Sequence, residues 1–172
     1  DLAEVSTTTF ASLSSTAIAQ ITAQARPEIS TAQLAVLTSA QAPGLSTVEL
    51  ASLSTAQMGA LSVAAMQALN STQFAAFGST QLLAMSSAQV ESLSKHALPL
   101  LGLDTLQALS PGQIQALTSA QIVLLNSSQL QAISPDSLRA LTTAALDAIS
   151  AENFGALRPA QIAALADGQI GV

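Results

Sequence analysis

Residues 53–60 read LSTAQMGA, and the same pattern returns in residues 69–76, LNSTQFAA, and in residues 77–84, FGSTQLLA. Each block starts with a bulky apolar residue, has glutamine at its fifth position, a second bulky apolar residue at its sixth and alanine at its eighth. Working outward, such blocks run without insertion or deletion from residue 5 to residue 172 and make 21 octads, with a half-octad at residues 1–4. This regularity predicts that residues 1–172 form one repeat array.

The composition of the octad predicts an all-α chain. We label the octad positions a to h. Position a is large and apolar in all 21 octads, and position f in 19, the exceptions being Arg26 and Ala42. Position b is Ser or Thr in 15 octads, and position e is Gln in 11 and Glu once, at Glu49. Leu, Ala and Gln favour helix over strand, so we expect short helices whose residues at a and f form the core.

A single continuous helix is excluded by the eight-residue period. Eight residues at about 100° each overshoot two turns by about 80°, so the apolar stripe would wind around the helix. Ser or Thr at b with Gln or Glu at e is the capping-box pattern of a helix start, as in Ser54 with Gln57 and Ser86 with Gln89. We therefore predict one two-turn helix per octad, from c through the next a, with b as a one-residue corner.

Other residues indicate the same helix starts. Proline is favoured at the first helical position, and the prolines at position c are Pro111, Pro135 and Pro159. Acidic side chains are favoured in the first turn, and those found there are Asp104, Asp136, Glu152 and Asp167. Asn70 and Asn126 stand at b, where Asn is a good N-cap. Both also match the N-glycosylation acceptor pattern, but capping explains them fully.

One octad cannot fold alone. Burying two large side chains contributes roughly 3–6 kcal/mol, whereas ordering eight residues costs roughly 8–16 kcal/mol of backbone entropy. Stacked octads close this gap, which is the property of a solenoid. The 24-residue spacing of the three prolines at c favours three helices per superhelical turn, with four as the alternative. The predicted fold class is therefore an all-α solenoid of 21 octapeptide repeats.

Two stretches depart from the pattern. Pro27, Pro43 and Pro99 stand at g, inside the predicted helices, where proline removes a backbone donor. We expect residues 21–44 and residues 93–108 to be less regular than the rest. These stretches are either degenerate repeats, the interpretation we favour, or a bend or a partner site.

Composition excludes several classes of partner. The net charge is −6 with only four Lys and Arg, whereas nucleic acids and anionic membranes require clustered basic residues. The chain has no cysteine, hence no disulfide, thiol nucleophile or thiolate metal site. We find no targeting segment and no stretch of about 18 apolar residues, so we expect no membrane insertion.

The residues that could carry chemistry are isolated. His96 is the only histidine, and the nearest acid in the sequence is Glu91. Asp104 and Glu152 are six octads apart, which places them two superhelical turns, or about 16–20 Å, from each other. That separation exceeds the roughly 9.5 Å limit of a glycosidase carboxylate pair. Phosphate-binding glycine motifs are absent. We expect no catalytic, cofactor-binding or metal residue, and no enzyme activity.

The octads LTSAQI (residues 117–122) and LSPGQIQA (residues 109–116) resemble the octapeptide arrays, of the LTTAQIAAL type, of very large bacterial surface and secreted proteins. The resemblance extends over essentially the whole chain and implies an extracellular or cell-surface location with an adhesin-like or matrix-like role. It transfers no functional residue, because the repeated motif is structural.

The expected function is that of a structural protein, an extracellular rod or spacer or a self-associating filament subunit. Neither end of the array has a polar capping repeat, which predicts end-to-end association or continuation of a longer array. The alternative is a protein-binding scaffold with an unknown partner. It is less favoured because binding faces are enriched in Tyr, Trp and Arg, whereas the four aromatic residues here occupy core positions: Phe10, Phe74, Phe77 and Phe154.

Overall fold

The computed structural model describes residues 5–24, 29–165 and 169. The half-octad 1–4, Arg26, Pro27 and Asp167 lie outside these residues. The described chain contains seventeen short α-helices and two 3-10 helices, which confirms the all-α class. It divides into two compact units, each described by itself: unit 1 comprises Asp1–Met85 and Ser92–Ala97, and unit 2 comprises Ser86–Glu91 and Leu98–Val172.

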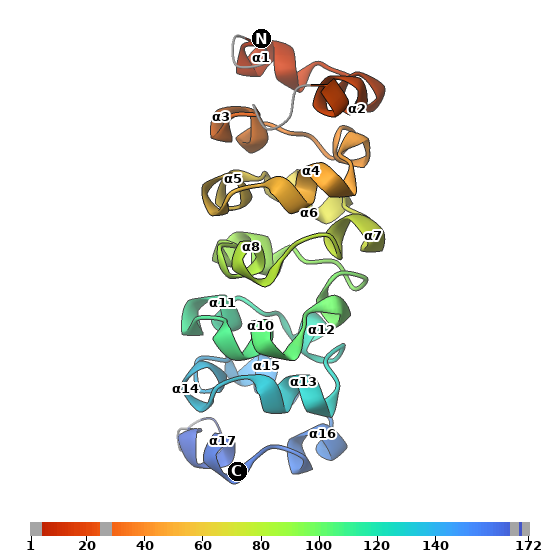
Figure 1. The fold of residues 1–172 in the computed structure, drawn as a ribbon. Helices are drawn as coiled ribbons and strands as arrows, with labels where there is room; N and C mark the ends of the chain where they lie inside the picture. The colour runs from red at the N-terminus through yellow and green to blue at the C-terminus, as the bar shows by residue number, and fades with distance from the viewer. Residues whose placement is uncertain (1–4, 25–28, 166–168, 170–172) are drawn as a thin grey trace. The chain divides into compact units, whose positions relative to one another are not determined.

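The helices follow one another at octad spacing (Figure 1). Those of unit 1 are α1 (Thr7–Ala11), α2 (Ser15–Gln24), α3 (Thr31–Ala35), η2 (Ala42–Gly44), α4 (Thr47–Ser52), α5 (Thr55–Ala60), α6 (Val63–Ala68), α7 (Ser71–Phe74) and α8 (Ser79–Leu83). Those of unit 2 are α9 (Ser87–Glu91), η3 (Leu98–Leu100), α10 (Leu103–Ala108), α11 (Pro111–Gln115), α12 (Ser119–Ile122), α13 (Ser127–Ala132), α14 (Pro135–Leu138), α15 (Thr143–Asp147), α16 (Ala151–Gly155) and α17 (Pro159–Ala164).

The residues at b start the helices by capping them. Ser54 Oγ accepts from the Gln57 N–H at 3.2 Å, and Gln57 Oε1 accepts from the Ser54 N–H at 2.9 Å. Ser86 and Gln89 form the same pair of bonds. The three prolines at c lie in the first turns of α11, α14 and α17, and both N-cap asparagines are confirmed, at α7 and α13.

The helices are shorter than the two turns expected. Apart from α2, each described α-helix has only four to six residues. The reason is that the residue at a can leave the helix as well as the residue at b. Leu53, for example, has φ −58° and ψ 132°, and the following Ser54 has φ −67° and ψ 165°. Two extended residues in succession turn the chain through the corner, so the apolar residue at a reaches the core from the corner itself.

Helix α2 runs through the corner expected at Thr22 and has ten residues. The octad of residues 21–28 carries Ala25 at e. It therefore lacks the glutamine that completes a capping box, and the helix continues instead of restarting. This is a departure from one break per octad.

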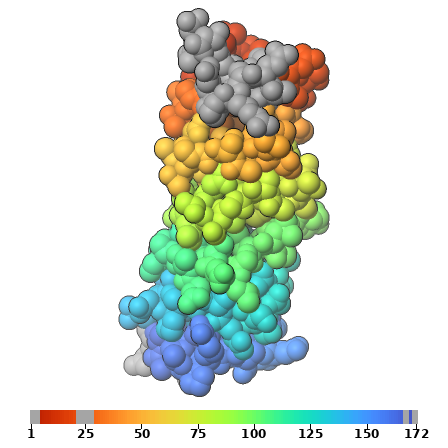
Figure 2. All heavy atoms as spheres, in the orientation of Figure 1, coloured from red at the N-terminus to blue at the C-terminus, as the bar shows by residue number. Residues whose placement is uncertain are grey.

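Helices pack against helices three octads away. The principal contacts join α3 to α5, α5 to α8, α11 to α14 and α14 to α17, and the other principal contacts keep the same three-octad interval. One superhelical turn, here called a coil, therefore contains three octads or 24 residues, and the alternative of four is excluded. Figure 1 shows α11, α14 and α17 at successive levels along one side of unit 2. Figure 2 shows the atoms of successive octads in unit 2 closely packed.

Three octad positions supply the interior of the coils. The residues at f are buried from Phe10 to Leu146 wherever they are described, and those at a are mostly buried. The rings of Phe74 and Phe77 meet edge to face, with their centroids 5.8 Å apart. The third inward position is e, which is discussed below. Every described residue at d is exposed, so the alanines at this position form an outer wall.

The prolines at g replace α-helix with 3-10 turns. Pro43 lies in η2 and Pro99 in η3, each after a turn that begins the octad. A proline at g cannot donate to the carbonyl at c, so the α-helical ladder is not completed. Residues 101–108, which belong to the second stretch expected to be less regular, form the helix α10 with Gly102 as its N-cap.

Gly44 is required by a close backbone contact. A Cβ atom at this position would lie 2.2 Å from the carbonyl oxygen of Ser15, whereas a Cβ atom at Gly155 would meet nothing within 4 Å. We expect Gly44→Ala to lower the free energy of unfolding by about 1–3 kcal/mol, as other overpacked sites do. Gly155→Ala, the control, should be neutral or stabilise by up to about 1 kcal/mol. Urea unfolding followed by circular dichroism measures both, and equal effects would show that the contact at Gly44 is unimportant.

Candidate functional site

The glutamine at e joins each coil to the preceding one. Gln81 is only 7% exposed. Its Oε1 accepts from the Gly78 N–H at 2.8 Å, which caps its own helix. Its Nε2 donates to the carbonyls of Leu50 at 2.8 Å and Leu53 at 2.6 Å. One side chain therefore satisfies a helix start on one side and two carbonyls of the preceding coil on the other.

The same geometry recurs in both units. Gln41 donates to the carbonyls of Phe10 at 2.7 Å and Leu13 at 2.9 Å. Gln161 donates to those of Leu130 and Ile133, both at 2.8 Å. In each case the two acceptors lie 31 and 28 residues earlier, at positions f and a. The acceptor at f belongs to the helix that ends at the corner, and the acceptor at a belongs to the corner itself.

The position of these glutamines corrects an expectation. We expected e to lie between the core and the surface, but most glutamines at e are buried, with Gln161 fully so. One signal in the sequence indicates this role. Glu caps a helix start at least as well as Gln, because the helix dipole favours a negative charge there. Eleven glutamines against one glutamate at e therefore point to a need for the amide N–H as a donor.

Octads without glutamine use other donors for the same carbonyls. Ser137 Oγ donates to the Leu109 carbonyl at 2.9 Å, 28 residues earlier. Asn153 Nδ2 donates to the Leu125 carbonyl at 3.2 Å, also 28 residues earlier. A hydroxyl or a shorter amide at e is therefore long enough to reach the corner of the preceding coil.

The octad with Ala65 at e shows how strongly these carbonyls require a donor. A glutamine at 65 would reach the carbonyls of Leu34 and Leu37. Instead, the Ser62 N–H donates to the Leu34 carbonyl at 3.1 Å, and the Ser62 hydroxyl donates to the Leu37 carbonyl. The residue at b replaces the missing side chain, because an unsatisfied carbonyl in a buried corner costs about 1–3 kcal/mol.

Successive corners are linked through single peptide groups. The N–H of Ser54 donates to Gln57 Oε1, and the C=O of the same peptide group, from Leu53, accepts from Gln81 Nε2. Gln57 in turn donates to the Ile29 carbonyl at 2.8 Å. Hydrogen bonds in such a chain polarise one another. Among the described residues, no buried side-chain nitrogen or oxygen lacks a partner.

The residues considered for chemistry lie on the surface. His96, Asp104 and Glu152 are exposed, and the latter two lie in the first turns of α10 and α16. No group of three or more His, Cys, Asp or Glu residues within the described ranges is arranged to hold a metal ion. None of the helices formed by the described residues has both the length and the apolar character needed to cross a bilayer.

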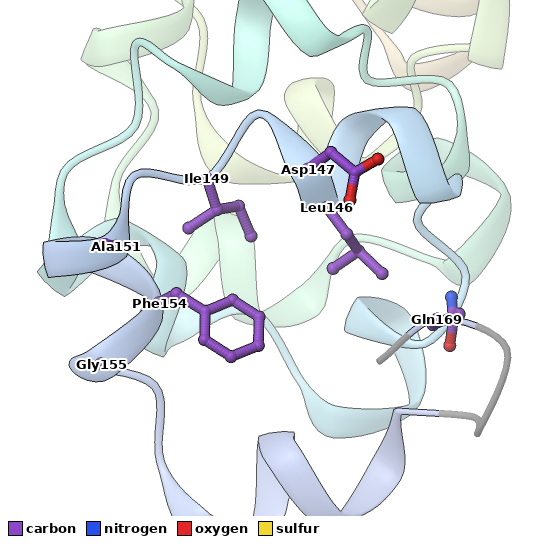
Figure 3. Close-up of a pocket in the computed structure, with 7 residues that line it drawn as sticks. All are labelled: Leu146, Asp147, Ile149, Ala151, Phe154, Gly155 and Gln169. Atoms are coloured by element: carbon purple, nitrogen blue, oxygen red, sulfur yellow. The ribbon is translucent and has the colours of Figure 1, made fainter. Parts of the chain in front are cut away.

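A groove lies beside α16 in unit 2, with a volume of about 510 Å³. The residues that line it are Leu146, Asp147, Ile149, Ala151, Phe154, Gly155 and Gln169. Figure 3 shows the side chains of Leu146, Ile149 and Phe154 facing one space. Phe154 is only half-buried, unlike the described residues at f that precede it. The sequence places Phe154 in the core and contains no signal for this groove.

Comparison with known families identifies the repeat in the C-terminal part of the chain. Residues 101–135 and residues 130–167 each match the model of the ALTTAQ repeat. Residues 101–167 therefore consist of ALTTAQ repeats. The comparison with curated proteins finds no match.

The glutamine contacts predict the cost of removing them. Gln81→Ala leaves the carbonyls of Leu50 and Leu53 and the N–H of Gly78 without this partner, and we expect a loss of about 2–4 kcal/mol in the free energy of unfolding. Gln57→Ala should cost less, because Gln57 is more exposed. Urea unfolding measures both. A loss below about 0.5 kcal/mol for Gln81→Ala would mean that water replaces these bonds.

Double mutants distinguish the corners from one another. Gln57 and Gln81 bond the same peptide group, whereas Gln73 donates to the carbonyls of Ala42 and Leu45 and shares no partner with Gln81. We therefore expect a coupling of at least about 0.5 kcal/mol between Gln57 and Gln81, and additive losses for Gln73 and Gln81. The coupling between Gln73 and Gln81 that a continuous row of glutamines predicts is not supported. The reverse pattern in a double-mutant cycle would contradict the linkage through peptide groups.

Proposed function

We propose, from the ALTTAQ repeats of residues 101–167 and the glutamine-closed corners of both units, that the chain is a structural repeat protein. It serves as a rod or spacer, or as a self-associating filament subunit, at the surface of a bacterial cell or outside it. The observation that carries the proposal is the use of the polar side chains at e. They bond the next coil and leave little chemistry for a substrate.

The outer surface supports the same proposal. The residues at d are exposed in every described octad, and most of them are alanine, serine or threonine. Only 8% of the chain is charged, and the titratable residues considered above stand apart from one another. Such a surface suits a spacer, because a spacer needs internal cohesion and length and does not need a reactive cleft.

A change in length tests the structural role. Because one coil is 24 residues, duplication of residues 109–132 adds one coil with all corner contacts repeated. In small-angle X-ray scattering we expect an elongated particle whose maximum dimension grows by roughly 8–10 Å, the spacing of packed helices. The duplicated chain should melt at or above the temperature of the original chain. A compact particle, or one of unchanged length, would exclude the rod.

The second candidate function is a protein-binding scaffold, and one surface patch favours it. Leu100, Leu103, Val123 and Leu124 are between 37% and 64% exposed. They flank one corner, because Gln129 donates to the carbonyls of Pro99 and Leu101 at 3.1 and 3.2 Å and accepts from the Asn126 N–H. Exposed apolar groups that lie together mark interaction sites more often than scattered ones do.

A charge in this patch tests the alternative. We expect Val123→Asp to leave the melting temperature unchanged, because the side chain is exposed, and to abolish any stoichiometric capture of a partner by the immobilised chain. Val48→Asp, which alters an exposed valine of unit 1, is the matched control. Capture that survives Val123→Asp would exclude the patch as the binding surface.

A further inference from the structure

The groove beside α16, called here the α16 groove, has an exact counterpart one coil earlier in unit 2. Subtracting 24 from the numbers of its apolar lining residues, Leu146, Ile149 and Phe154, gives Ile122, Leu125 and Leu130. These three earlier residues are at most 1% exposed. The same surface is therefore covered in one coil and open in the next.

The element that covers the earlier surface is α16 itself. It packs on α13, and its Asn153 donates from position e to the carbonyl of Leu125. At the α16 groove the corresponding carbonyl is that of Ile149. By the 28-residue rule of the other corners, this carbonyl takes a donor from position e of an octad in the next coil. The groove thus has the shape and the acceptor for one more octad.

We propose that the α16 groove receives helix α1 of a second copy of this chain, which joins the copies head to tail. This inference rests on the self-association form of the proposed function and assigns its contact site. It continues the coil-to-coil interface already present inside each unit. The 21 octads also make seven whole coils of three, so the octad 5–12 of a second copy arrives in the phase that the groove requires.

Helix α1 fits this role because its position e is open. Thr9 is exposed, whereas the glutamines at e in later octads already bond a preceding coil. The hydroxyl of Ser137 shows that a hydroxyl at e reaches the corner carbonyl, at 2.9 Å. Helix α1, TTTFA, carries no charge, so it meets no like-charge repulsion from Asp147 at the edge of the groove.

Cysteine pairs test the contact, because the chain has no cysteine of its own. Inside unit 2, Ser119 Oγ donates to the Ala144 carbonyl at 2.8 Å, so positions c and d touch at a separation of 25 residues. The equivalent pair between copies is Ala151 of one copy and Thr8 of the other, both exposed. Mixing Thr8→Cys chains with Ala151→Cys chains under mild oxidation should give a disulfide-linked dimer, since the Cα atoms then lie within about 7 Å.

The matched control uses the same octad position one coil earlier. Ser127 is the counterpart of Ala151, but α16 already occupies the next coil there. Mixing Thr8→Cys with Ser127→Cys should give at least tenfold less dimer. The double variant Ser119→Cys/Ala144→Cys is the internal positive control for the geometry. Equal yields from the two mixtures would overturn the assignment of the groove.

A blocking variant tests the same contact without cysteine. Ala151→Arg places bulk and charge at the rim of the groove without touching the core, and Ala160→Arg does so on an exposed d position outside it. In sedimentation velocity, Ala151→Arg should weaken association at least tenfold, and Ala160→Arg should leave it unchanged. Melting curves check that both variants fold.

The outcomes separate this inference from the proposed function. Association that Ala151→Arg leaves intact overturns the groove assignment, and self-association then stands on another contact. A chain that stays monomeric at all concentrations overturns both the groove assignment and the filament form. The spacer form is then decided by the scattering measurement alone.

Discussion

The glutamine at position e is the interaction on which the stacking of coils depends. A chain that turns a corner every eight residues exposes backbone groups at every turn, because a helix of four to six residues cannot satisfy most of its own ends. Gln81 resolves this by accepting from the N–H of Gly78 and donating to the carbonyls of Leu50 and Leu53. Without such a side chain, the corners would require water, and water at the corners would separate the coils.

This constraint explains why substitutions at e keep a donor. Serine at 137 and asparagine at 153 still reach the carbonyl 28 residues earlier. Where alanine stands at 65, the backbone and hydroxyl of Ser62 move into the role. The carbonyls of the corner, more than the identity of the residue at e, are therefore the conserved feature of the coil-to-coil contact within this chain.

The same rule gives meaning to the open surface beside α16. A surface that carries the apolar residues and the corner carbonyl of a coil is complementary to another octad, because every covered coil in unit 2 is built in that way. Repetition thus turns the internal packing rule into a rule for association. A protein of this kind needs no separate docking module, since each coil is both the product of the preceding one and the template of the next.

The sequence by itself determined the all-α class, the octad register and the helix starts. These are local properties: Ser54 with Gln57, Pro111 and Asn126 specify helix N-termini through bonds within four residues. The 24-residue spacing of three prolines also favoured three helices per coil.

Only the tertiary structure decided that glutamine at e is buried, that the residue at a shares the corner, and that a groove remains beside Phe154. The physical reason is distance along the chain. The partners of Gln81 lie 28 and 31 residues away, and a capping box looks the same in the sequence whether its amide N–H donates to water or to the coil before it.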